Sequence, residues 1–180
     1  MKNLLVVCCF VVIFMGCNLK FDDLKDIVYW NNRVLKFDKE LSFKICGRDT
    51  LIKDDFINTY KMLVCVGPTG CSDCQLHLYG WKRMIDSLYD IKDKLEFIFV
   101  IYVDDYLKFE LLQQQNHFNH PVIYDPRGIF FKQNNIPTDK TVHVFLLDGE
   151  NKVLAVGDPV KNMNIFNLYM KLISNQMCTN

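Results

Sequence analysis

The hydrophobic residues of this chain fall into runs that alternate between strand-like and helix-like spacing. Residues 62–66 form an unbroken apolar run that predicts a strand buried on both faces, and the glycines and proline of residues 67–70 end it. Residues 95–103 form a second strongly β run, in which Glu96 is the one charged residue. Between the two runs a helical spacing links Leu76, Tyr79, Met84, Ile85 and Leu88. Two such strands joined by a helix predict a parallel, right-handed crossover unit.

The remaining patterns continue this alternation and predict the rest of the fold. We expect a hairpin at 41–45 and 50–52, a helix at 106–118, a strand at 122–124, helical turns at 128–134, a hairpin at 141–147 and 152–156, and a helix at 163–173. The first hairpin leads into the run at 62–66, with its turn at Gly47-Arg48-Asp49. The sequence therefore predicts an α/β fold with a central mixed sheet flanked by helices, in which the parallel part comes first.

The N-terminal segment is typical of an export signal. A short basic start precedes an apolar run at residues 4–15, which is shorter than the roughly 20 residues that a membrane-spanning helix needs. Gly16-Cys17 follows this run and resembles the lipobox of bacterial lipoproteins, although Phe14 and Met15 depart from the usual residues. The resemblance implies that Cys17 carries lipid and becomes the mature N-terminus. A plain signal peptide and an uncleaved anchor are the alternatives, and each of the three places the body outside the cytoplasm.

The domain organisation follows from this segment and from the composition. We expect a lipoprotein signal peptide at residues 1–16, a lipid anchor and tether at 17–34 that includes a short amphipathic helix at 21–30, and one folded domain at 35–177. Half of the residues are hydrophobic, which is enough for a core. The 21 basic and 21 acidic residues balance, so nothing indicates a nucleic-acid partner.

Two cysteines, Cys71 and Cys74, follow the turn at residues 67–70. The helical spacing places both thiols in the first turn of a helix, where unpaired backbone N–H groups and the helix dipole favour a thiolate. Cys71 is the more acidic thiol of the expected pair, although the negative charge of Asp73 opposes this effect. The spacing of three residues allows a disulfide with little backbone movement, so the pair is a candidate redox couple.

The other cysteines have different expected roles. Two of the eight lie in the export signal and one is the lipidation residue, which leaves Cys46, Cys65, Cys71, Cys74 and Cys178. In an exported chain a CxxC pair readily forms a disulfide, whereas the same pair in the cytosol would favour zinc. Cys65 lies inside the apolar strand and is expected to be inert core, and neither Cys46 nor Cys178 is expected to be catalytic.

The segments GCSDCQLHLYGWKRMI and FLLDGENKVL, together with the order of elements, resemble extracytoplasmic thiol-disulfide oxidoreductases of the TlpA/ResA type. The first segment also resembles small thioredoxin-like lipoproteins of Gram-negative envelopes. The resemblance implies a thioredoxin-like fold for the domain at 35–177, with Cys71 as the nucleophile and Cys74 as the resolving cysteine. It further implies protein thiols or disulfides of the cell envelope as partners, a membrane contact through the N-terminal lipid, and neither a cofactor nor a metal.

The substrate groove implied by the resemblance is atypical. The family places a cis-proline opposite the CxxC, and the alignment puts Val142 there, between Thr141 and His143; Gly70 lines the same groove in place of an aromatic residue. The nearby Pro137 is interpreted as an ordinary loop proline. The buried acid that the family places six residues before the first cysteine is replaced by Cys65, so the proton relay to the second thiol is missing.

Two alternative functions remain open at this point. The missing acid, aromatic residue and proline also fit a non-catalytic binding or structural lipoprotein in which Cys71 and Cys74 form a static disulfide. A copper-binding module would add His77 or His143 to the two cysteines, but positions three residues apart drift around a helix and make a poor chelate. Of the remaining polar and aromatic candidates, Trp81 is expected to anchor packing, Asp104 and Asp105 to cap the next helix, and His117 and His120 to be exposed loop residues.

Overall fold

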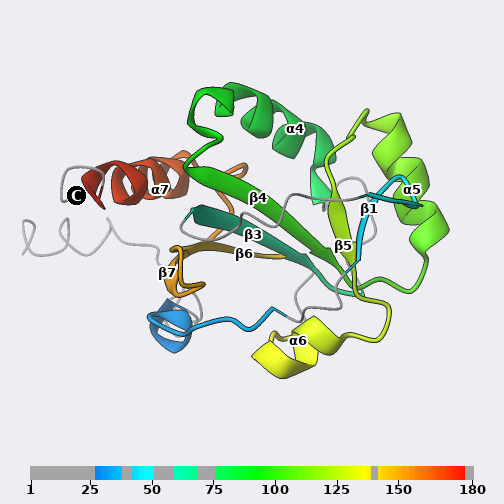
Figure 1. Ribbon diagram of the computed structural model, residues 1–180, viewed down its shortest axis with the longest axis horizontal. Helices are drawn as coiled ribbons and strands as arrows, with labels where there is room; N and C mark the ends of the chain where they lie inside the picture. The colour runs from blue at the N-terminus through cyan, green and yellow to red at the C-terminus, as the bar shows by residue number, and fades with distance from the viewer. Residues whose placement is uncertain (1–26, 38–41, 51–58, 69–75, 139–141, 177–180) are drawn as a thin grey trace, which may run out of the picture. The chain divides into compact units, whose positions relative to one another are not determined.

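The computed structural model describes residues 27–37, 42–50, 59–68, 76–138 and 142–176 (Figure 1). The chain divides into two compact units, Met1–Trp30 and Asn31–Asn180. In the first unit, residues 27–30 form a helical turn, which is the described part of the helix expected at 21–30. No helix within the described ranges is long and apolar enough to cross a membrane. The predicted export signal and the predicted lipidation residue Cys17 lie outside those ranges.

The second unit is built on one seven-stranded sheet in the order β2-β1-β5-β4-β3-β6-β7. The strands are β1 (Phe43–Ile45), β2 (Arg48–Asp49), β3 (Tyr60–Val66), β4 (Leu95–Ile101), β5 (Val122–Tyr124), β6 (Val142–Leu147) and β7 (Val153–Val156). Strand β4 runs parallel to both of its neighbours, β3 and β5, whereas β6 runs antiparallel to both β3 and β7. The predicted α/β fold with a mixed sheet is confirmed.

Helices cover both faces of this sheet. They are α4 (Leu78–Ser87), α5 (Tyr106–Gln115), α6 (Ile129–Asn134) and α7 (Met163–Gln176), with a short 3₁₀ turn η1 (Tyr89–Ile91) after α4. Figure 1 shows α4 and α7 over one face of the sheet and α6 against the other. The helices α4, α5 and α7 contribute Trp81, Phe109 and Tyr169 to one hydrophobic cluster. Trp81 is therefore a packing residue, as predicted, and its ring meets that of Phe99 edge-on at 5.7 Å.

The central strand β3 is buried on both faces, as its composition predicts. Met62, Val64 and Val66 belong to the cluster beneath α4 and α7. Successive side chains of a strand point to opposite faces, so Leu63 and Cys65 lie on the face that α6 covers. All five side chains are at most 1% exposed. A strand without a solvent-facing side must be apolar throughout, which is the pattern that residues 62–66 show.

The first hairpin lies at the far edge of the sheet. Strand β1 pairs with β5 on one side and with β2 on the other, so β4 and β5 separate it from β3. The turn falls at Cys46-Gly47, one residue earlier than expected, with φ values of 46° and 79°. Two consecutive positive φ values are the mark of a two-residue hairpin turn. Glycine suits the positive φ of Gly47, and a side chain there would also displace the Glu110 carboxylate, which would lie 2.7 Å away.

The expectation of an exposed His120 is corrected by its packing. His117 is exposed, as expected. The His120 ring, however, contacts the rings of Phe97, Phe99 and Phe118, and its Nε2–H donates to the Phe97 carbonyl at 2.8 Å. Burial lowers the pKa of His120, while the hydrogen bond to Phe97 opposes that shift. The folded protein therefore favours the neutral imidazole.

We expect this histidine to make the protein less stable in mild acid. The unfolded chain binds a proton near the ordinary histidine pKa of 6.5, whereas the folded chain resists it down to a lower pH. The free energy of unfolding should therefore fall as pH drops below about 6.5. Urea unfolding of the wild type and of His120→Phe at pH 7.5 and pH 5 measures this effect, and the variant should show the weaker pH dependence.

The control for this experiment is His117→Asn, because His117 is exposed and has a positive φ that asparagine tolerates. This variant should keep the pH dependence of the wild type. An equal dependence in wild type and His120→Phe would show that His120 is protonated as easily in the folded chain as in the unfolded one.

Candidate functional site

The sequence-predicted site is only partly within the described ranges. Cys71, Cys74, Gly70 and Thr141, as well as the lipidation residue Cys17, lie outside them. Val142 and His143 are described, as are the central strand before the cysteine pair and helix α4 after it. The structure therefore shows the surroundings of the predicted site, which are the end of β3, the start of β6, the end of β7 and the start of α4.

The end of β3 and the start of β6 lie side by side. Val66, the last residue of β3, is directly opposite Val142, the first residue of β6. Cys71 follows Val66 by five residues along the chain. The topology therefore brings the predicted groove residue Val142 to the end of the sheet from which the cysteine segment departs. Open α/β sheets place their functional groups at this end, outside the carboxyl ends of the parallel strands.

The other edge of β6 extends beyond its partner β7. The last strand pair joins Phe145 to Val156, and the Gly157 N–H then donates to the Val144 carbonyl at 3.0 Å. Beyond this bond the chain turns at Asp158, whose carboxylate accepts the backbone N–H of Val160 at 2.9 Å. Backbone groups two residues apart in a strand point the same way, so the N–H and C=O of Val142 point past the end of β7. Among the described residues, no strand pairs with β6 on this side beyond Val144.

Helix α7 holds the end of β7 in place. The Tyr169 hydroxyl donates to the Gly157 carbonyl at 2.9 Å, and the side chain of Tyr169 is fully buried. Burial raises the pKa of Tyr169, so the hydroxyl keeps its proton and remains a donor. The point at which β7 leaves the sheet is therefore set by a buried contact from the last helix.

His143 lies inside the protein, on the face of the sheet that α6 covers. Its side chain is 7% exposed, its ring is parallel to that of Phe145 at 6.3 Å, and Nε2–H donates to the Pro137 carbonyl at 2.8 Å. It is directly opposite Cys65 across the β3·β6 pair. Because its side chain is buried, His143 can contribute to a groove only through its backbone and by fixing the orientation of β6. The Ile136–Pro137 bond is trans, in agreement with an ordinary loop proline.

Cys65 is the buried thiol that the sequence predicts. It is 0% exposed and is not part of a disulfide. Burial raises the pKa of its thiol well above the ordinary value, and the negative charge of Asp125 adds to this effect. Because the thiolate is the reactive form of cysteine, Cys65 is inert in the folded protein, as expected.

Helix α4 begins later than the apolar spacing predicts. Its first residue is Leu78, and His77 before it has a left-handed backbone with φ 49° and ψ 42°. Leu76 and Leu78 are both buried, although positions two apart point in opposite directions on one helix. The left-handed residue turns the chain so that both leucines reach the core. Leu76 is itself helical, so His77 separates a helical segment that ends at Leu76 from α4, which begins at Leu78. The expectation of one continuous helix is therefore wrong at His77, and the expected helix start at Cys71 and Cys74 lies outside the described residues.

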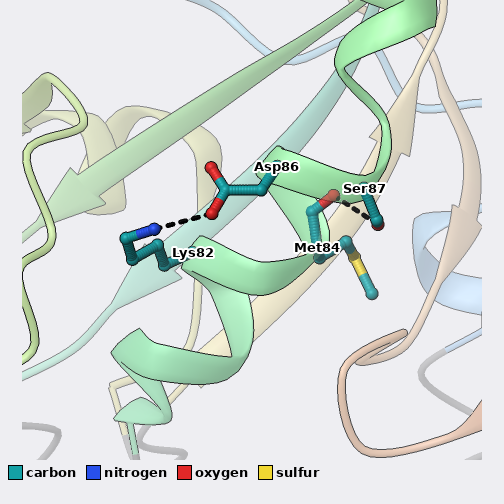
Figure 2. A network of polar contacts seen from close by, with 4 residues as sticks. All are labelled: Lys82, Met84, Asp86 and Ser87. Carbon is teal, nitrogen blue, oxygen red and sulfur yellow. Dashed lines mark hydrogen bonds and ion pairs between the residues drawn. The ribbon is translucent and has the colours of Figure 1, made fainter.

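The body of α4 shows how the helix is oriented. Figure 2 shows the solvent-facing side, where Lys82 forms an ion pair with Asp86 at 2.6 Å and the Ser87 hydroxyl donates to the Met84 carbonyl at 2.8 Å. On the inner side Gly80 approaches the turn after β7, because a methyl group there would lie 2.6 Å from Val160. Glycine at this position lets the helix that follows the cysteine pair pack closely against the turn beyond Gly157.

Of the two acidic candidates that follow β4, one has a structural role. Asp105 is the N-cap of α5, and its side chain accepts the Lys108 N–H at 2.9 Å, as predicted. Asp104 is exposed. The sequence analysis missed Asp125, which is 2% exposed and accepts the N–H groups of Ile129 and Phe130 at the start of α6. The signal for it was Asp125-Pro126-Arg127-Gly128, an acid and turn residues immediately before a helix.

A metal site can be tested only in part. Among the described residues no three or more His, Cys, Asp or Glu side chains are grouped so that they could hold a metal ion. Cys71 and Cys74 are not among those residues, and of the two histidines considered with them, His77 is exposed and His143 is buried.

Comparisons with known proteins establish what this architecture is. No protein-family model matches the sequence, and no curated protein matches it either. Solved structures do match. The thioredoxin domain of a thiol-disulfide oxidoreductase from Bacteroides vulgatus gives a TM-score of 0.61 at 14% identity, covering 79% of this chain and 97% of that one. A thiol-disulfide oxidoreductase from Bacteroides fragilis gives 0.52 at 16% identity, covering 71% and 95%.

A further match is a thioredoxin-like protein in its oxidised form, with a TM-score of 0.57 at 11% identity over 81% of this chain and 97% of that one. At these identities the likeness concerns the fold alone. It agrees with the mixed sheet, with the parallel unit around β3 and with the antiparallel hairpin and helix at the C-terminal end. The second unit of this chain therefore has the thioredoxin fold.

Proposed function

We propose that this chain is a lipid-anchored, extracytoplasmic protein that exchanges thiols and disulfides through Cys71 and Cys74. The observation that carries the proposal is the position of the CxxC along the chain, shortly after the buried central strand β3. The end of β3 is paired with the start of β6, where the edge at Val142 extends past β7. A reactive cysteine pair beside an open strand edge can receive an extended segment of another protein and act on its disulfide.

The proposed reaction proceeds through a mixed disulfide. The Cys71 thiolate attacks one sulfur of a partner disulfide, the partner S–S bond breaks, and the second partner sulfur leaves as a thiolate. The Cys74 thiolate then attacks the Cys71 sulfur and releases the partner as a dithiol. Two electrons pass from the chain to the partner, and the chain keeps an intramolecular disulfide. The reverse sequence oxidises a partner dithiol, so the reduction potential of the pair decides the direction.

The proposed location rests on the N-terminal segment. Residues 1–16 act as the signal peptide, lipid on Cys17 anchors the chain, residues 17–34 form the tether, and the thioredoxin-like domain spans 35–177. The partners are protein thiols or disulfides of the cell envelope. No cofactor takes part, because both electrons are carried by the sulfur atoms. Metabolic labelling with a fatty acid, lost in Cys17→Ala, tests the anchor.

The test of the exchange chemistry is trapping of the mixed disulfide. Without Cys74 the intermediate on Cys71 cannot resolve, so Cys74→Ala treated with oxidised glutathione should carry one glutathione that dithiothreitol removes. Intact-mass spectrometry detects the adduct. The matched control, Cys71→Ala with Cys74 retained, should carry far less, because Cys74 is the resolving thiol.

The alternative of a static disulfide gives the opposite result. In that case Cys74→Ala forms no adduct, and the wild-type pair stays oxidised in dithiol buffers poised down to about −300 mV, as structural disulfides do. Titration of the wild type in dithiothreitol buffers of known potential, followed by alkylation of the free thiols, gives this measurement. A pair that is reduced at a higher potential supports the exchange function.

A further inference from the structure

The side chain of His143 connects the start of β6 to the loop that precedes it. Its Nε2 lies 2.8 Å from the Pro137 carbonyl oxygen, and since a carbonyl only accepts, Nε2 carries the proton. The ring is parallel to that of Phe145 on the same strand and is 7% exposed. The imidazole is therefore held by stacking on one side and by a hydrogen bond at its tip. We call this hydrogen bond the His143–Pro137 clamp.

The clamp lies at the start of β6, where the described pairing with β7 has ended. On its β7 side the β6 ladder stops at Val144, which accepts the Gly157 N–H. Val142 and His143 extend past that point and are paired with β3 through Val66 and Cys65. Among the described strands, only β3 pairs with the first two residues of β6, and the clamp attaches this strand end to Pro137 as well. Residues at such strand ends fray easily unless a further contact holds them.

We propose that His143 is a positioning residue, which uses the His143–Pro137 clamp to hold the Val142 backbone where an extended segment of a disulfide-bearing protein pairs with it. The inference rests on the proposed function and adds to it how the docking edge is fixed. In a chain without a proline at Val142, the rigidity of this edge comes from a buried imidazole. A small non-peptide disulfide, 2-hydroxyethyl disulfide, has no backbone that could pair with the edge, so the clamp matters for peptide and protein substrates alone.

The test compares two substrates in the full chain. His143→Phe keeps an aromatic ring beside Phe145 and removes the donor, whereas His143→Gln keeps an N–H of similar reach. With insulin as the protein disulfide and dithiothreitol as the reductant, His143→Phe should raise KM about fivefold with little change in kcat, the loss expected for one hydrogen bond. Its reaction with 2-hydroxyethyl disulfide should stay within about twofold of wild type, and His143→Gln should recover most of the loss with insulin.

Leu147→Val is the matched control. Leu147 is on the same strand and the same face, four residues from His143, is fully buried, and its side chain cannot donate a hydrogen bond. Its truncation loosens packing, so any effect on activity should be the same for both substrates. The inference is overturned if His143→Phe slows both substrates equally or neither, or if His143→Gln is no better than His143→Phe.

The two proposals fail in distinguishable ways. A wild-type protein that reacts with neither insulin nor 2-hydroxyethyl disulfide contradicts the exchange function, and the inference about His143 fails with it. A wild-type protein that reacts with 2-hydroxyethyl disulfide but not with insulin keeps the exchange chemistry and excludes the docking edge. A wild-type protein that reduces both, with a His143→Phe variant that does not separate them, contradicts the positioning role alone.

Discussion

Replacing Cys71 by serine is expected to reduce disulfide exchange to the background rate, a loss of at least about 100-fold. A hydroxyl group cannot form the mixed disulfide, and at neutral pH it supplies almost no anion to attack sulfur. The assay is insulin reduction with dithiothreitol, followed by the turbidity of the precipitating chains. Cys74 alone cannot replace the lost nucleophile, because the resolving step needs a sulfur on Cys71 to attack.

The control for this experiment is Cys46→Ser. Cys46 is a half-buried cysteine of the β1·β2 turn, is not part of a disulfide, and lies at the edge of the sheet far from β3 in strand order. Serine is nearly isosteric with cysteine, so activity should be unchanged. Full activity in Cys71→Ser, or an equal loss in Cys46→Ser, would contradict the assignment of Cys71 as the nucleophile.

Asp125→Ala is expected to be the most destabilising of the cap substitutions, with a loss of about 3 kcal/mol in the free energy of unfolding. Its two carboxylate oxygens accept the Ile129 N–H at 2.7 Å and the Phe130 N–H at 2.9 Å, and the side chain is 2% exposed. Alanine leaves both N–H groups without an acceptor in a place that water does not reach. Hydrogen bonds to a charged group contribute about 1.5–3 kcal/mol each, and part of this is recovered as α6 relaxes.

Asp105→Ala is the matched comparison, because Asp105 also caps a helix but is exposed. Water replaces the lost acceptor at α5, so the loss should be about 1 kcal/mol. Urea unfolding at pH 7 measures both variants, and Asp125→Asn, which keeps one acceptor oxygen, should fall between them. Equal losses for Asp125→Ala and Asp105→Ala would show that the burial of Asp125 adds nothing.

The cysteine pair and its surroundings were predictable to different degrees. The apolar run at 62–66 predicted a doubly buried strand, and with it the burial of Cys65. The spacing after the pair predicted a helix but not its start, because the left-handed backbone of His77 leaves no trace in the apolar pattern. The buried position of His143 could not be predicted either, because alternation along one strand does not say which face α6 will cover.

Some polar residues are understood only from contacts far along the chain. Lys61 interrupts an apolar strand, yet it is 3% exposed, and its Nζ donates to the carbonyls of Thr59, Asp148 and Gly149. Burial lowers the pKa of Lys61, and the charge of Asp148 opposes this effect. The acceptors from Asp148 and Gly149 lie in the turn between β6 and β7, so no local pattern around Lys61 could indicate them.

The sequence by itself determined the alternation of strands and helices, the turn residues, the Asp105 cap and the cysteine pair after the central strand, because each depends on side-chain periodicity or on neighbours within a few positions. Only the tertiary structure decided that β1 lies beyond β5, that α4 starts at Leu78, that Val142 extends past β7, and that the His143 ring bonds to Pro137. These features depend on which distant segments share a face or an edge. That choice is made by burial of the whole core, and local spacing carries no record of it.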